Sequence, residues 1–282
     1  MNFDMEKETT KTIFISIPAP LIVRNMLMLP NSVLHYLRQK ENLKIVLLVP
    51  DSAYEKMRTD FSTKSMQVPP GEVIVEPIQV AWRPKKFSHK LYNFFSTYLI
   101  FTDSARIFAK YGVRPDKPVA GGKMGRYLYY LKIIIANTFG RIRWVKEWVM
   151  PRLNSVVYKE RPYKEVFEAY NPDLVFLPDV LGTQDVSILR EAKHQNIKTV
   201  GMTGSWDHLS KWFEPLHADS LIVWSKTFQE EAIALQNYKA QDIVITGVPQ
   251  YDLFADSNLI LPREKFLKQF NLDPKRKLIL FA

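Results

Sequence analysis

The alternation of short β-branched runs with helical periodicity constrains the fold of this chain most strongly. The runs predicted as strands are residues 12–17, 44–49, 73–75, 174–177, 198–202, 221–224 and 243–245, and helical spacing is found at 26–38, at 183–195 and from Thr227. Because parallel strands need a crossover, usually a helix, this order indicates a parallel sheet covered by helices. We therefore expect an α/β fold with a Rossmann-like, doubly wound parallel sheet.

Capping residues predict where the helices of this pattern begin. Thr183 is expected to cap the helix that continues to about residue 195, and Asp185 to complement the helix dipole from the first turn. Val186, Leu189 and Ala192 are expected on one face of that helix. Residues 227–230 fit a capping box for the next helix, and Ser225, just upstream, is also expected to be a cap.

A basic helical insertion, about residues 85–165, interrupts the alternation. Two segments, 88–111 and 123–149, are predicted to be helical, with a loop between them. From Arg83 to Lys164 the chain has 18 Lys and Arg residues against four acidic residues, whereas its overall net charge is +10. The remainder is therefore slightly acidic, and the concentration of positive charge in one region points to an anionic partner.

The cations of this region interleave with aromatic residues, as in 90–95 and 141–148. This pattern is typical of a helix that lies on anionic lipid. It also suits single-stranded nucleic acid, or a helical subdomain whose aromatic residues form a core and whose charges are solvated. No nucleic-acid recognition motif accompanies it. We therefore expect residues 85–160 to contact an anionic membrane surface, and we expect no nucleic acid as a partner.

Composition excludes several kinds of chemistry. The chain has no cysteine, so disulfides, thiol catalysis and cysteine-based zinc sites are excluded. The five histidines show no zinc-ligand spacing, and neither a P-loop nor a Gly-x-Gly-x-x-Gly motif is present. We expect no metal and no cofactor. The longest apolar stretch, 127–139, is broken by Lys132 and is shorter than the ~20 residues that cross a bilayer. A cytoplasmic protein, peripheral on the inner face of the cell membrane, is expected.

Loops that follow the strands hold the candidate site residues, because ligands of open α/β sheets bind beyond the carboxyl ends of the strands. Arg24 and Asn25 follow the first strand and precede a helix, where a cation and backbone N–H groups can hold an anion. Asp179 follows the strand 174–177 and could bind a sugar hydroxyl, although a turn-forming Asp is the commoner role. Arg24 could equally be a surface residue and Asn25 a helix cap.

Residues 203–212 are the richest of these loops in chemical groups. Asp207 or His208 is the candidate catalytic base, which would remove a proton from an acceptor hydroxyl. The neighbours expected to bind substrate are Ser205, Trp206 and Lys211. An indole face commonly stacks on a ring. The alternative is a helix capped by Ser205 or Asp207, with Trp206 buried.

Several segments, taken in their order along the chain, resemble one group of proteins. They are Arg24-Asn25, 171–176, 185–192, Ser205-Trp206-Asp207, 221–225, 230–232 and 244–252. Together they look like bacterial GT-B fold proteins of surface-polysaccharide biosynthesis, which are similar in turn to CDP-glycerol glycerophosphotransferases and UDP-N-acetylglucosamine 2-epimerases. His208 replaces an Asn of the motif in that group. Trp206, His208 and Lys211 loosely match the Trp-His-Gly-Thr-Pro-Leu-Lys motif of the glycerophosphotransferases, in which His is the base.

This resemblance implies a domain organisation. Residues 1–255 would form the acceptor-side domain, and 256–282 a linker and the first elements of a truncated donor-binding domain. A helix, 263–270, and a buried parallel strand, 278–281, are expected within it. Gly247 would let the backbone turn closely beside a ligand or the other domain.

The implied activity is transfer of a sugar from a nucleotide-activated donor to a lipid-linked or polymeric acceptor. One alternative is glycerophosphate transfer from CDP-glycerol, or epimerisation of a UDP-sugar, on the same fold. Another is a non-catalytic protein that binds glycan or scaffolds an assembly at the membrane.

Overall fold

The chain forms two compact units, Met1–Gly247 and Val248–Ala282. A computed structural model describes residues 10–18, 33–56, 58–59, 72–80, 86–111, 122–249, 251–252 and 260–279. The first unit contains the sheet and the helical insertion. In the second unit the described regular element is helix α12, Arg263–Gln269, where the sequence predicts a helix.

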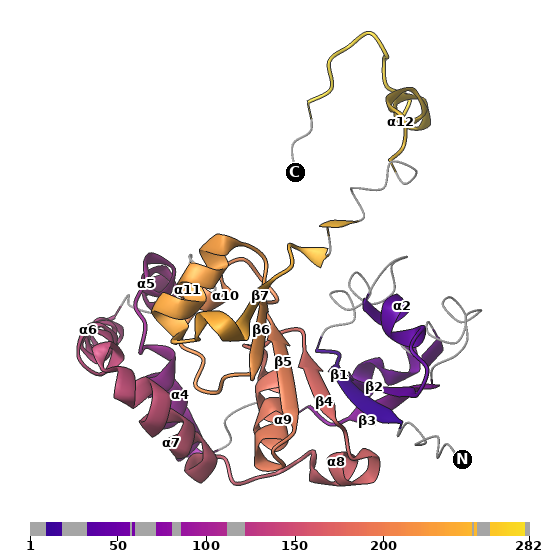
Figure 1. Cartoon of the computed structure of the whole chain (residues 1–282). Helices are drawn as coiled ribbons and strands as arrows, with labels where there is room; N and C mark the ends of the chain where they lie inside the picture. Colours follow the sequence, from indigo (N-terminus) through magenta and orange to yellow (C-terminus); the bar gives the residue numbers. More distant parts are fainter. Residues whose placement is uncertain are drawn as a thin grey trace, which may run out of the picture. The chain divides into compact units, whose positions relative to one another are not determined.

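The first unit is built on a seven-stranded, all-parallel sheet (Figure 1). Its strands are β1 Lys11–Ser16, β2 Leu43–Pro50, β3 Glu72–Ile78, β4 Leu174–Leu177, β5 Lys198–Met202, β6 Ser220–Val223 and β7 Ile243–Ile245. They are arranged in the order β3-β2-β1-β4-β5-β6-β7. The order reverses between β1 and β4, which is the switch point of a doubly wound sheet. The prediction of a Rossmann-like α/β fold is confirmed.

Both faces of the sheet are covered, because alternate residues of each strand point to opposite sides. In β1, Phe14 packs edge-on against Phe167 at 5.0 Å between ring centroids, and Ile15 belongs to the core on the other face. Burying a side chain such as Phe14 contributes about 2 kcal/mol to the free energy of unfolding. The first core includes residues of α8 Lys164–Tyr170, α9 Thr183–His194 and α11 Lys226–Gln236, and the second includes α2 Val33–Arg38.

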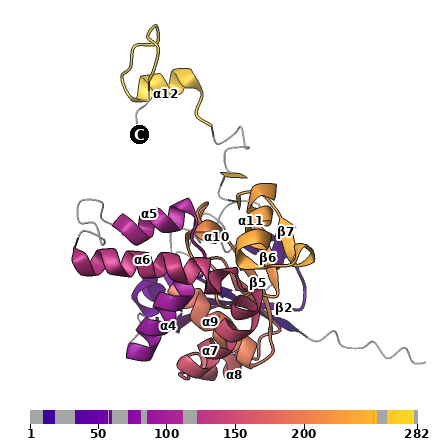
Figure 2. The same cartoon turned by 90° about the vertical axis from the view of Figure 1, so that its left-hand side faces the viewer.

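The helical insertion forms a third core together with Phe213, which comes from the connection between β5 and β6. Its helices are α4 Phe87–Thr97, α5 Asp103–Tyr111, α6 Lys123–Asn137, a π-helical turn Val145–Val149 and α7 Met150–Val157. Tyr92, Ile135, Met150 and Phe213 are among the side chains buried there. The two predicted helices are each interrupted, at 98–102 and at 138–142. Helix α9 lies between the sheet and the α4–α7 pair (Figure 1), and Figure 2 shows α5 and α6 side by side.

Two predicted helix starts are wrong in detail. Gly182, rather than Thr183, occupies the N-cap position of α9, and no side chain caps it. Ser225 is the N-cap of α11 and its hydroxyl accepts a hydrogen bond from the Phe228 amide at 3.4 Å, as expected for a cap. The capping box at 227–230 is therefore wrong, because the helix begins one residue after Ser225.

The buried strand predicted at 278–281 is not found over residues 278–279, which have no strand conformation. Ile279 is 91% exposed. An apolar run becomes a buried strand only where another strand pairs with it, and the described part of the second unit offers none. The remaining residues of the predicted strand lie outside those described.

A buried polar cluster fixes the chain between β5 and β6, which includes the short helix α10 His208–Lys211. The fully buried Gln236 amide donates to the Leu209 and Trp212 carbonyls at 2.6 and 2.9 Å and accepts from the Glu214 amide at 2.8 Å. Tyr238 donates its hydroxyl to the Glu214 carboxyl at 3.1 Å. Burial raises the pKa of Glu214 to about 8.

We expect this pKa to give the free energy of unfolding a distinct pH dependence. A carboxyl whose pKa is higher in the folded state keeps its proton longer when folded, so stability falls as pH rises from about 4.5 to about 8. His217, stacked on Tyr238 at 4.4 Å, has a pKa that burial lowers to about 4, and it opposes this trend only below about pH 6.5.

In denaturant titrations, the free energy of unfolding should therefore fall between pH 6.5 and 8 in the wild type and stay nearly constant in Glu214→Gln. The Gln side chain keeps the oxygen that accepts from Tyr238. Glu230→Gln, an exposed change on α11, should follow the wild-type curve. If the free energy of unfolding depended on pH in the same way in the wild type and in Glu214→Gln, the raised pKa of Glu214 would not be the cause of that dependence.

Candidate functional site

The loops after β4 and β5 bring Asp179 and His208 together. Leu177 of β4 is paired with Gly201 of β5, so the carboxyl ends of these strands are adjacent. His208 Nδ1 lies 3.3 Å from Asp179 Oδ1, and the two side chains are only 15% and 20% exposed. A carboxylate and an imidazole from separate loops thus meet beside the switch point of the sheet.

Glycines allow these loops to approach so closely. A Cβ on Gly204 would lie 3.2 Å from both the Asp179 carboxylate and the His208 ring, and a Cβ on Gly182 would lie 2.8 Å from Asp179 Oδ2. Beneath the loop, a Cβ on Gly201 would lie 2.2 Å from Val180 Cγ1. Separations below 3.0 Å are not tolerated between carbon atoms without movement. The position of Asp179 therefore depends on small residues on three sides.

Burial determines the charge state of the pair. It lowers the pKa of His208 below its ordinary value, and it raises the pKa of Asp179. His208 is therefore neutral at pH 7 and able to accept a proton. With a proton on Nδ1, which faces Asp179, the Nε2 atom is the basic nitrogen.

Asp207 has a different environment, although it is adjacent in sequence. Its Oδ2 lies 2.9 Å from Lys211 Nζ, and its Oδ1 accepts from the Ser205 hydroxyl at 2.9 Å. Burial opposes ionisation, but these hydrogen bonds hold the pKa of Asp207 below its ordinary value. Asp207 is thus a paired anion and a weaker base than His208. Trp206 is 72% exposed, so the alternative in which it is buried is wrong.

Asp185 supports the site from within the fold, although the sequence suggests only a helix-dipole role. Its side chain is fully buried, its Oδ1 accepts from the Ser16 hydroxyl, and its Oδ2 accepts from the Asp179 amide at 2.7 Å. Gln184 donates to Ser16 Oγ at 2.9 Å. Burial raises the pKa of Asp185 well above its ordinary value. Asp185 lies in the first turn of α9, as expected, and in addition it joins the ends of β1 and β4. Most residues of α9 are polar, so the sequence held no signal that singled out this pair.

The helical insertion also braces the site, which sequence reasoning missed. Thr102 donates its hydroxyl to the Ser210 carbonyl, and Lys211 Nζ lies 4.3 Å from the centroid of the Phe108 ring. Phe108 also packs edge-on against Trp212. Helix α5 is therefore in direct contact with α10, the helix that begins at His208.

The other predicted site residues are not brought into this cluster. Arg24 and Asn25 lie outside the described residues. Gly247 ends the first unit with φ of 89°, in the region that favours glycine, and a Cβ there would have no heavy atom within 4 Å. Its open surroundings indicate a backbone requirement rather than close packing.

The part of the chain that the structure describes contains neither a metal site nor a membrane-spanning helix. No three His, Asp or Glu side chains there lie close enough together to hold a metal ion. No helix in the same set has both the length and the apolar character needed to cross a bilayer. In comparisons with known proteins, no family model and no curated protein matches the chain.

The pairing of Asp179 with His208 predicts a change in the His208 titration. An anion beside an imidazole favours its protonated form, so Asp179→Asn should lower the His208 pKa further. NMR titration of the imidazole Cε1–H signal, assigned with His208→Gln, measures this shift. Asp173→Asn is the matched control, because Asp173 precedes β4 and lies at the opposite end of that strand, about 13 Å along it at ~3.3 Å per residue. An unchanged or higher pKa in Asp179→Asn would overturn the pairing.

Proposed function

We infer that this chain carries the acceptor site of a transferase in which His208 removes the proton from an acceptor hydroxyl. The observation that supports the proposal is the Asp179–His208 pair, 3.3 Å apart, beyond the carboxyl ends of a doubly wound parallel sheet. A neutral imidazole oriented by a carboxyl group is a frequent general base for hydroxyls, and this edge of such sheets is where ligands bind.

The proposed reaction moves a sugar from a nucleotide-activated donor to a lipid-linked or polymeric glycan acceptor. The acceptor oxygen forms the new glycosidic bond, the bond between the anomeric carbon and the nucleoside diphosphate breaks, and the acceptor proton goes to His208 Nε2. Asp179 stabilises the resulting imidazolium. Trp206, with its exposed indole, offers a face for a sugar ring.

The same base would also serve the second candidate, glycerophosphate transfer from CDP-glycerol. The reaction products distinguish sugar transfer from glycerophosphate transfer and from epimerisation. Sugar transfer releases a nucleoside diphosphate, glycerophosphate transfer releases CMP, and epimerisation yields an isomeric nucleotide sugar. A glycan-binding or scaffolding protein would give saturable binding without any of these products.

We expect His208→Gln in the full-length natural protein to lower kcat/KM at least ~100-fold, the usual contribution of a general base. Turnover is measured as nucleotide release from UDP-, GDP- and CDP-activated donors. His194→Gln, an exposed change at the end of α9, serves as the matched control. Because burial lowers the His208 pKa, the acid limb of the wild-type pH profile should lie below pH 6.5. Undiminished turnover by His208→Gln would exclude it as the base.

The helical insertion is proposed to hold the protein on the inner face of the cell membrane. Large apolar side chains that are at least half exposed cluster on α6 and just after it, and they are Met124, Tyr127, Tyr130, Ile134, Trp144 and Trp148. Exposed cations accompany them, among them Arg126 and Arg141. Aromatic residues beside cations favour the interface of an anionic bilayer.

Vesicle sedimentation tests this contact. The protein should bind vesicles containing phosphatidylglycerol more tightly than vesicles of phosphatidylcholine alone, and the double change Arg126→Gln/Arg141→Gln should reduce that binding about thirtyfold, at ~1 kcal/mol per cation. Trp144→Ala/Trp148→Ala should weaken binding to both kinds of vesicle. Trp206→Ala removes an equally exposed indole outside the insertion and should have no effect. Binding that all three variants retain in full would refute the proposed surface.

A further inference from the structure

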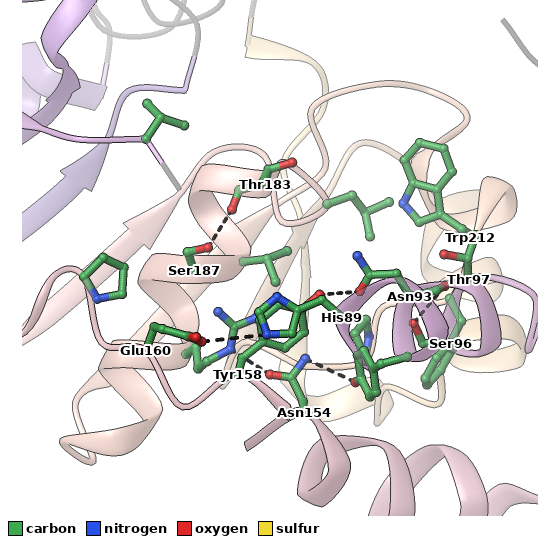
Figure 3. A pocket seen from close by; sticks show the side chains of 18 of the residues that line it. His89, Asn93, Ser96, Thr97, Asn154, Tyr158, Glu160, Thr183, Ser187 and Trp212 are labelled. Carbon is green, nitrogen blue, oxygen red and sulfur yellow. Dashed lines mark hydrogen bonds and ion pairs between the residues drawn. The ribbon is translucent and has the colours of Figure 1, made fainter. Parts of the chain in front are cut away.

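A pocket of about 720 Å³ lies between α4, α7 and α9, in the first unit (Figure 3). Its volume is typical of sites for small organic ligands. Asp179 and His208 do not line it, although Leu181 and Trp212, from the same two loops, form part of its wall. The pocket is therefore a neighbouring space and not the candidate catalytic site itself.

The pocket wall contains a buried cation that forms no ion pair among the described residues. Arg190 is only 9% exposed, its Nε donates to Asn154 Oδ1 at 2.8 Å, and its guanidinium carbon lies 4.2 Å from the Tyr158 ring centroid. No carboxylate of the described residues forms an ion pair with it. By contrast, Arg161 pairs with Glu191 at 2.5 Å. A guanidinium stays protonated in a protein, so burying it without an anion costs several kcal/mol.

Hydrogen bonds fix this guanidinium in place. Asn154 accepts from Arg190 and donates its amide to the Tyr92 hydroxyl at 3.1 Å, which in turn donates to the Met150 carbonyl at 3.0 Å. Such a chain uses only the Nε of Arg190 and orients the rest of the guanidinium group. Both Nη atoms remain as donors.

Other polar groups of the wall strengthen the preference for an anion. The Asn93 side-chain oxygen accepts from the Tyr158 hydroxyl at 2.6 Å, which leaves its amide nitrogen as a further donor. Glu160, the acid on the wall, faces His89 at 3.8 Å (Figure 3). It also pairs with Lys86 at 2.5 Å, which offsets its charge.

We propose that this pocket binds an amphipathic phosphate, with its phosphoryl group on the Arg190 guanidinium and its apolar body against the aromatic wall. The two Nη groups and the Asn93 amide outnumber the two oxygens of a carboxylate and match the three of a phosphomonoester. Trp212 and Phe213 supply ring surface for an apolar body, whereas the Tyr158 ring is already stacked with His89 and covered by Arg190. The inference does not depend on the transferase proposal, because it concerns binding alone.

Binding of three probes to the chain tests this site. The probes are inorganic phosphate, phenyl phosphate and dihexanoylphosphatidic acid, each titrated while the Arg190 Nε–H resonance is followed by NMR. Phenyl phosphate or the lipid phosphate should shift that resonance saturably and bind at least tenfold more tightly than inorganic phosphate. Tighter binding of phenyl phosphate indicates a soluble ester as the natural ligand, and tighter binding of the lipid indicates a headgroup.

A matched pair of variants identifies the residue. Arg190→Gln should weaken binding of the better probe about tenfold or more, the usual loss for a charge-assisted hydrogen bond. Arg152→Gln removes an exposed guanidinium from α7 and should leave affinity unchanged. If Arg190→Gln does not fold, the wild-type titration still decides the question. The proposal is overturned if no probe shifts the Arg190 resonance, or if folded Arg190→Gln binds as tightly as the wild type. Neither result would bear on His208→Gln turnover.

Discussion

A buried carboxyl group at the switch point of the sheet organises the candidate site. Asp185 accepts hydrogen bonds from Ser16 at the end of β1 and from the backbone of Asp179 after β4. At this point the chain leaves β1 and β4 in opposite directions along the sheet. Without Asp185, the ends of the two strands would be held together only by the hydrogen bonds of the sheet. Because a buried polar group without partners costs about 1–3 kcal/mol, each member of this contact stabilises the placement of the others. The direction of Asp179 towards His208 follows from it.

Helix α9 links this arrangement to the pocket, because the helix is buried on two opposite faces. Ile188, Leu189 and Ala192 pack on the sheet. Thr183, Val186, Ser187 and Arg190, spaced as i, i+3, i+4 and i+7, line the pocket on the other side. One helix therefore positions the first-turn Asp185 for the sheet edge and Arg190 for the pocket. The helical insertion contributes to both sites. Its helices α4 and α7 form part of the pocket wall, and α5 contacts α10, which carries His208.

Local patterns predicted most of the fold and part of the site. The runs 174–177, 198–202 and 243–245 coincide with observed strands, because β-branched composition and length are properties of the segment itself. The rule that ligands bind beyond strand ends led to Asp179 and His208 separately. Their contact could not be predicted, because it depends on how closely two loops approach. The role of Asp185 depends on Ser16, 169 residues away. The expected face with Val186, Leu189 and Ala192 is divided, since Val186 faces the pocket.

The contact between Val180 and Gly201 links the evolutionary histories of two positions. With a Cβ at residue 201 only 2.2 Å from Val180 Cγ1, any larger residue at 201 first requires a smaller one at 180. Drift can replace most core residues one at a time with others of similar volume, but position 201 can gain a side chain only after position 180 has lost volume. Among descendants of this sequence, we therefore expect the spacing between the Asp179 loop and β5 to stay the same while the surrounding core residues change.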